Sequence, residues 1–138
     1  MHKRFLRIGS LLMAFSVLLG AFGAHSLKTL LDESSMQAYH TAVLYHMVHA
    51  VGMIIASLIY KRYQTPSTRW ALYFFLAGLI CFSGSLYAIA IGKVIGFSFP
   101  TFFNLITPLG GVLFIIGWIA LFFGVPSEKE GEQPESRQ

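Results

Sequence analysis

The sequence predicts an all-α integral membrane protein, a four-helix bundle with up-down topology and both termini in the cytoplasm. Its 138 residues are 55% hydrophobic and only 12% charged, whereas soluble domains are about 25% charged. Four apolar stretches are long enough to cross a bilayer, which takes about 20 residues each. Basic residues concentrate at one end of these stretches, as the positive-inside rule expects of cytoplasmic segments. No stretch is left for a soluble domain, so we expect a single membrane domain.

The first expected span covers residues 6–24 and follows a basic start, Met1–Arg7. A secretory signal peptide is the alternative, because small residues near Ala21 and Gly23 would suit cleavage. The apolar run of about 17 residues is long for a signal core, and three more spans follow it. We therefore expect the first span to be retained.

The second expected span, residues 39–60, contains three histidines: His40, His46 and His49. His46 and His49 are three residues apart and so share one face of a helix. An ionisable side chain in the hydrocarbon is expensive and is by default a functional hypothesis. The other spans are therefore interpreted as packing around this face.

The remaining spans are expected at residues 70–91 and 108–123. The first loop carries Ser34 and Gln37 in the spacing of a capping box, which predicts that the second helix begins near Ser35. Residues 1–124 would form the four-span membrane domain. Residues 125–138 are polar with four glutamates, which is typical of a disordered tail.

The distribution of basic residues predicts the orientation. In a four-span chain the amino terminus, the middle loop and the tail lie on one side. That side holds eight of the ten lysines and arginines, and the other side holds only Lys28 and Lys93. The excess places both termini in the cytoplasm.

Unusual polar residues of all four spans fall in the outer half of the predicted bundle. By helix rise, the key histidines and serines lie roughly 9 to 15 Å below the outer surface. These candidate binding residues are His25, His46, His49, Ser83, Ser85, Tyr87 and Thr107. The alternative is structural: hydroxyls commonly bond a neighbouring backbone in membranes, a neutral imidazole can bond across a bundle, and tyrosines favour the interface.

Small residues predict where helices approach closely. Gly20 lies in a stripe of small residues spaced by four, and Gly23 follows it near the outer end. Gly84 begins a similar stripe in the third span. Gly110 and Gly117 belong to a seven-residue repeat in the fourth span and so share one face. Such stripes let neighbouring backbones come together.

The order of these motifs resembles that of the small four-span membrane proteins called the domain of unknown function 423 family. The segments that carry the resemblance are Leu19–His25, the region of His49, Phe82–Tyr87, Thr107–Gly111 and Gly117–Trp118. The resemblance implies a bacterial inner-membrane protein with a retained first span and supplies no established activity. His25 and His49 fall on the family pattern.

Three functions are compatible with these residues. The preferred hypothesis is a non-enzymatic protein that binds a small ligand or another membrane protein in its outer half. The second is transport of a small solute or proton by an oligomer, with His25 and His49 as the protonatable pair. The third is a metal, haem or quinone site, for which His25, His46 and His49 would supply the nitrogens.

We expect no enzyme activity, because the sequence has no P-loop, no G-x-S-x-G motif and no paired carboxylates. We also expect no bound cofactor and no nucleic-acid partner, since the basic residues flank the spans. The expected partners are the lipid bilayer and another membrane protein or further copies of the chain.

The orientation is directly testable with topology reporters. A periplasm-active enzyme fused after Gln138 should be silent, and the same enzyme inserted near Ser34 should be active, because eight of the ten basic residues lie on the side of the termini. Activity after Gln138 together with silence at Ser34 would contradict the orientation.

Overall fold

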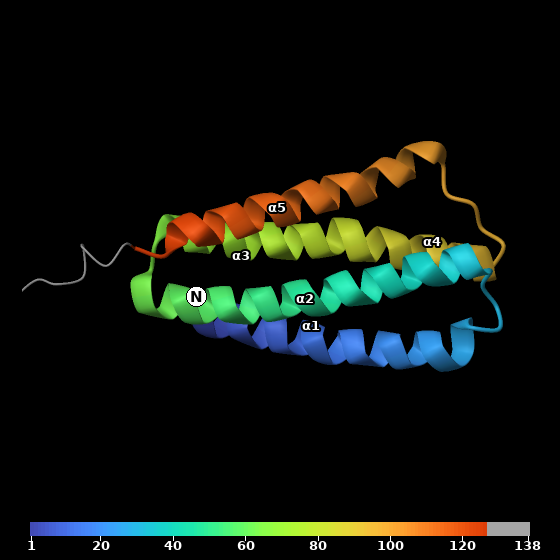
Figure 1. Cartoon of the computed structure of the whole chain (residues 1–138), viewed down its shortest axis with the longest axis horizontal. Coiled ribbons are helices and arrows are strands. Elements are labelled where there is room, and N and C mark those ends of the chain that lie inside the picture. The colour runs from blue at the N-terminus through green and yellow to red at the C-terminus, as the bar shows by residue number, and fades with distance from the viewer. Residues whose placement is uncertain (127–138) are drawn as a thin grey trace, which may run out of the picture.

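The computed structural model describes residues 1–126 and contains four long helical rods (Figure 1). The first rod is α1 (His2–Phe22) continued by η1 (Gly23–Leu27), and the second is α2 (Glu33–Tyr63). The third rod joins α3 (Pro66–Leu79), η2 (Ile80–Gly84) and α4 (Ser85–Val94). The fourth joins η3 (Thr101–Leu105) and α5 (Ile106–Gly124). All four rods are long and apolar enough to span a membrane.

The predicted all-α class and its four spanning helices are confirmed, but each helix extends beyond the expected apolar segment. The second helix begins at Glu33 because Asp32, in extended conformation, accepts a hydrogen bond from the amide of Ser35. The capping box expected at Ser34 and Gln37 is therefore wrong. The third rod begins earlier as well, with Thr65 as its cap and a proline in the first turn, where no partner for its nitrogen is lost.

The rods run up and down. The start of α1, the connection between α2 and α3, and the end of α5 all lie at one end of the molecule (Figure 1). That this end faces the cytoplasm stays a prediction. The expected disordered tail lies almost wholly outside the described residues.

Two rods contain a turn of π-helix, η1 near the outer end of the first rod and η2 in the middle of the third. A π turn interrupts the regular i to i−4 ladder and re-aims the side chains around it. The η2 turn contains Phe82 and Ser83, and α4 resumes directly at Ser85. The interruption therefore falls on the sequence motif that the resemblance singled out.

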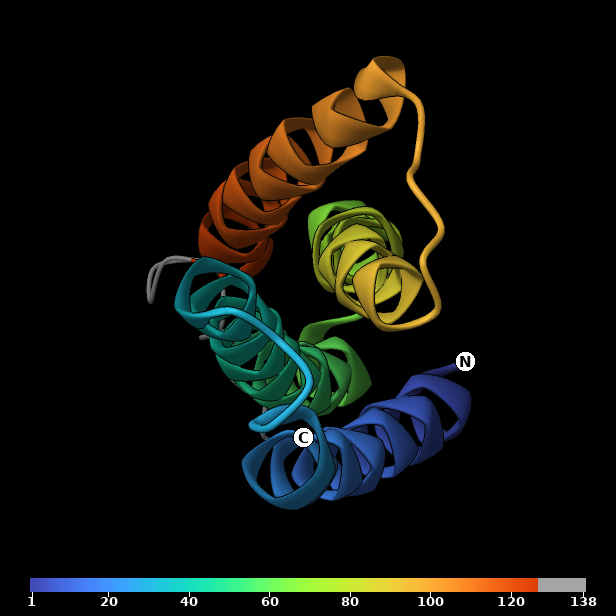
Figure 2. The same ribbon diagram turned by 90° about the vertical axis from the view of Figure 1, so that its right-hand side faces the viewer.

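The four rods form two close pairs, α1 with α2 and α3 with α5, joined by contact between α2 and α3 (Figure 2). In the first pair, an added Cβ at Gly9 would lie 3.2 Å from the carbonyl oxygen of Ala50. One at Gly23 would lie 2.5 Å from the ring of Tyr39, whose hydroxyl donates to the carbonyl of Leu19 at 2.7 Å. At Gly20 it would meet only the side chain of Val43, at 3.4 Å.

The second pair is held by glycines of α5 against the third rod. A Cβ at Gly110 would collide with the backbone nitrogen of Phe82 in η2 and lie 2.8 Å from its Cα. A Cβ at Gly117 would lie 2.8 Å from the ring of Phe75. Gly84 differs from this pattern, because a Cβ there would meet only the carbonyl of Leu79, at 3.9 Å. The close approach expected at Gly84 is therefore not present.

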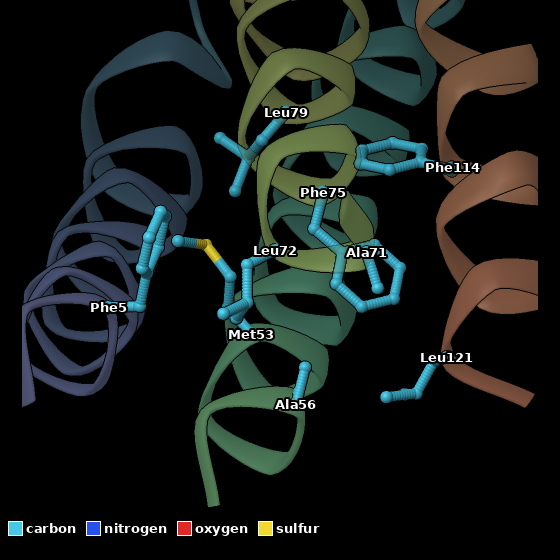
Figure 3. Close-up of a cluster of buried hydrophobic side chains, with 9 residues drawn as sticks. All are labelled: Phe5, Met53, Ala56, Ala71, Leu72, Phe75, Leu79, Phe114 and Leu121. Carbon is cyan, nitrogen blue, oxygen red and sulfur yellow. The ribbon is translucent and has the colours of Figure 1, made fainter. Parts of the chain in front are cut away.

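The larger of two buried apolar clusters draws side chains from α1, α2, α3 and α5 (Figure 3), and the smaller one lies toward the other end around Tyr39 and Ala90. The larger cluster consists of Phe5, Met53, Ala56, Ala71, Leu72, Phe75, Leu79, Phe114 and Leu121. Interiors of this kind are close-packed, so they tolerate added volume poorly. This cluster fixes the positions of α2, α3 and α5 on the side of His49 that is nearer the termini.

Adjacent glycines of α5 provide a matched test of this packing. Gly110→Ala should lower stability by about 1–3 kcal/mol, the usual cost of overpacking, because its methyl group would meet rigid backbone. Gly111→Ala should be neutral or stabilising, since a Cβ there would lie 3.8 Å from the ring of Phe82, an ordinary contact. Thermal unfolding of both variants in mild detergent measures the difference. Equal stabilities would mean that α5 does not approach η2 as described.

Candidate functional site

His49 lies near the middle of α2 and is 4% exposed. Its Nδ1 lies 2.8 Å from the backbone carbonyl of Tyr45, one turn earlier. The indole N–H of Trp118, on α5, donates to its Nε2 at 3.2 Å. A carbonyl only accepts and an indole only donates, so Nδ1 carries the proton and the ring is neutral. Both nitrogens are thereby satisfied, and the second bond links two helices that otherwise make few contacts.

Aromatic rings surround His49. The Phe114 ring stacks on the imidazole with centroids 3.4 Å apart and planes 12° apart. The Tyr45 ring stacks on Phe82 at 4.5 Å. Trp118 meets the Phe75 ring edge-to-face at 4.9 Å. The rings, rather than backbone contact, fill the space between α2 and α5.

Trp118 also depends on a glycine of α2. An added Cβ at Gly52 would lie 3.2 Å from two atoms of the indole ring. Gly52 is three residues after His49, so both lie on the face of α2 that meets Trp118. The small residue makes room for the indole and the histidine binds its N–H.

A pocket of about 530 Å³ lies beside His49 and Trp118, between α2 and α5. Its walls are Leu44, Tyr45, Val48, His49, Phe82, Gly111, Phe114, Ile115 and Trp118. Leu44 and Ile115 at its edge are 59% and 61% exposed, so the pocket faces the bilayer rather than an aqueous end. His49 and Trp118 supply its polar side-chain atoms together with the Tyr45 hydroxyl.

His46 faces a different part of the molecule. It is 2% exposed, and its Nδ1 lies 3.3 Å from the hydroxyl of Tyr87 on α4. Within residues 1–126, its buried Nε2 has no hydrogen-bond partner. His46 and His49 thus bond to groups on different helices, although they are only three residues apart.

The two serines expected in the site, Ser83 and Ser85, hydrogen-bond to groups on other rods. Ser83 donates to the carbonyl of Ala42 on α2 at 2.9 Å. Ser85 and Thr107 share a hydrogen bond of 2.6 Å between α4 and the start of α5. Neither serine hydrogen-bonds to His49, but Phe82, next to Ser83, lines the same pocket as His49. The expected proximity of His49 to these segments stays a prediction. The candidate residues form separate pairs rather than one outer-half pocket.

His25 and His40 are exposed at the outer end. Within residues 1–126, no three histidine, cysteine or acidic side chains group as metal ligands would. The metal site imagined from His25, His46 and His49 is therefore not assembled in the described part of the chain.

A salt bridge joins two helices at the end of the bundle opposite the termini. Lys93, at the end of α4, lies 3.3 Å from the carboxylate of Asp32 and also donates to the hydroxyl of Ser35. Hydrogen bonds from the Ser34 hydroxyl and the Ser35 amide, helped by Lys93, hold the pKa of Asp32 far below its usual range. A carboxylate that stays ionised caps α2 and ties it to α4 over a wide pH range.

Sequence reasoning missed Trp118, Phe114, Phe82 and Tyr45 as members of the site. One signal was present: an indole N–H inside an apolar span needs an acceptor, and acceptor side chains are scarce in these spans. The i, i+4 spacings of Tyr45 with His49 and of Phe114 with Trp118 place each pair on one helix face. No spacing rule shows that these two faces meet.

The chain is similar in sequence to proteins of one known family. The family model described as "Protein of unknown function (DUF423)" matches residues 19–111. This chain belongs to that family. The UPF0382 membrane protein YwdK of Bacillus subtilis is 39% identical over 120 residues, covering 86% of this chain and 93% of the relative. A UPF0382 membrane protein of Haemophilus influenzae is 36% identical over 124 residues, covering 90% and 94%.

A further UPF0382 membrane protein, from Staphylococcus epidermidis, is 38% identical over 119 residues, covering 86% of this chain and 92% of the relative. No solved structure matches the chain. The family names describe membrane proteins of unknown function, in agreement with the resemblance found in the sequence. This DUF423 member is accordingly a multi-pass protein of the bacterial cell membrane.

The bond between Trp118 and His49 can be measured with a double-mutant cycle. His49→Phe and Trp118→Phe should each destabilise the protein, and their coupling energy should be about 0.6–1.7 kcal/mol, the range for interhelical bonds in membranes. Unfolding in detergent gives the four stabilities. Trp70→Phe, at a lipid-exposed tryptophan on α3, serves as control and should show no coupling with His49→Phe. Strict additivity at His49 and Trp118 would contradict the bond.

Proposed function

We propose that this protein is a non-enzymatic binding protein for a flat, ring-bearing molecule dissolved in the bilayer. The pocket between α2 and α5 is the proposed site. The observation that carries the proposal is its lining: a space of about 530 Å³ walled by four aromatic rings and one imidazole. Ligand sites typically have this size, with apolar walls and few polar groups.

The chemistry of the walls favours rings over simple acyl chains. Stacked and edge-to-face ring pairs contribute about 0.5–1.5 kcal/mol beyond the area they bury. Tyr45, Phe82 and Phe114 already lie in such arrangements with each other and present ring surface to the pocket. A planar guest would continue these stacks. The hydroxyl of Tyr45, which lines the pocket, would meet a carbonyl or hydroxyl on its ring.

Transport receives less support from the geometry. The proposed proton pair, His25 and His49, is split between an exposed position at the outer end and a ring whose two nitrogens are both bonded. A proton relay needs a group that can gain and lose a proton along a chain of partners. His49 would first have to release Trp118.

Fluorescence of Trp118 tests the proposal. In a Trp70→Phe background, Trp118 is the sole tryptophan, because the chain has two. A short-chain naphthoquinone titrated into the purified protein in detergent should quench its emission saturably, since a bound quinone would contact the indole. Gly111→Leu should abolish the saturable component, because the added side chain would fill the pocket next to Phe82.

Ala21→Leu is the matched control, since it places the same leucine side chain at an exposed position of α1 outside the pocket. It should quench as the parent does, and thermal unfolding should show all three proteins folded. Linear, collisional quenching in the parent would contradict the proposal. Saturable quenching that Gly111→Leu leaves unchanged would contradict it equally.

A further inference from the structure

Charge is distributed very unevenly over the described residues. Six lysines and arginines lie at the end that holds the start of α1 and the connection between α2 and α3: Lys3, Arg4, Arg7, Lys61, Arg62 and Arg69. Both acidic residues within residues 1–126, Asp32 and Glu33, lie at the opposite end. The basic end therefore carries six positive charges with no described carboxylate near them.

A groove opens at this basic end between α1 and α3. It has a volume of about 420 Å³ and is lined by Met1, Arg4, Phe5, Ile8, Tyr73 and Leu76. The two helices touch there through the rings of Phe5 and Tyr73, which meet edge-to-face at 5.2 Å. Elsewhere α1 packs chiefly on α2. This groove is separate from the ring-lined pocket between α2 and α5.

The groove has two chemically distinct parts. Arg4 supplies a guanidinium at its mouth, and the arginine is exposed rather than paired with a described carboxylate. One turn farther along α1, at the hydrocarbon side, Ile8 faces Leu76 of α3 across apolar walls. By helix rise, Arg4 and Ile8 are separated by about 6 Å. A guest that suits both parts needs an anionic group joined to a hydrocarbon chain.

We propose that this groove binds one acidic phospholipid of the leaflet at the basic end. Its phosphate would lie at Arg4, whose planar fork matches phosphate oxygens, and one acyl chain would lie between Ile8 and Leu76. Basic pockets between membrane helices are suited to anionic headgroups. The complementarity of the exposed Arg4 guanidinium and the apolar groove to a phosphodiester and its chain carries the assignment.

Native mass spectrometry of the full chain tests this proposal. The protein is reconstituted with equal amounts of phosphatidylglycerol and phosphatidylethanolamine of identical acyl chains, extracted in mild detergent and examined for retained lipid. We expect one retained phosphatidylglycerol in preference to phosphatidylethanolamine. Arg4→Gln should lower this retention about fivefold, the effect of one basic side chain at an anionic membrane surface.

Two further variants separate the groove from a diffuse basic surface. Arg62→Gln removes the same charge from the same end, but Arg62 lies over the ring of Tyr63 and outside the groove, so retention should stay within twofold of the parent. Ile8→Trp keeps every charge and fills the apolar part, so retention should fall as it does for Arg4→Gln. Glycerol phosphate, the headgroup without chains, should not displace the lipid.

Three outcomes would overturn the proposal. The first is equal retention of the two lipids by the parent protein. The second is an equal loss in Arg4→Gln and Arg62→Gln, which would indicate a diffuse charge effect. The third is full retention in Ile8→Trp, or displacement by glycerol phosphate, either of which would show that no chain occupies the groove. Thermal unfolding of each variant excludes loss of the fold as the cause.

Discussion

The hydrogen bond from Trp118 to His49 is the polar contact that joins the fourth rod to α2 across the bundle. Hydrocarbon offers no water to polar groups, so a polar group there is stabilised by a partner inside the protein. The indole N–H and the imidazole Nε2 satisfy each other at 3.2 Å, and each would be costly alone. The same constraint explains why Ser83 bonds to α2 and why Ser85 bonds to Thr107.

The location of the ring-lined pocket follows from how the helix pairs differ. Glycines such as Gly9 on α1 and Gly110 on α5 bring the backbones of the paired rods close together. Between α2 and α5, aromatic rings hold the two helices apart. These flat side chains, joined by one hydrogen bond, do not fill the space between the helices completely. The ring-lined pocket forms at this interface, where aromatic groups take the place of close backbone approach.

The sequence allowed the fold to be predicted well, because hydropathy and helix length decide membrane spans almost alone. The helix boundaries were less accurate, since Asp32 caps α2, which begins at Glu33, two residues before the expected start. The site could be predicted only in part. Depth along a helix follows from residue number, so His46 and His49 were expected at similar depths. Direction around the helix axis depends on how the rods pair, and the sequence did not predict that His46 bonds to Tyr87 whereas His49 bonds to Trp118.

Satisfying the polar interior also determines where this protein can bind other molecules. His49, Ser83, Ser85 and Thr107 are used in holding rods together, which leaves few free groups inside the bundle. The binding that we propose therefore lies on surfaces that face lipid, where space exists beside partly exposed side chains. The ring-lined pocket at mid-height and the arginine-capped groove at the basic end differ in chemistry because they lie at different depths. At mid-height only ring faces and one shared hydrogen bond are stable, whereas at the end of the span a guanidinium can remain charged beside apolar walls.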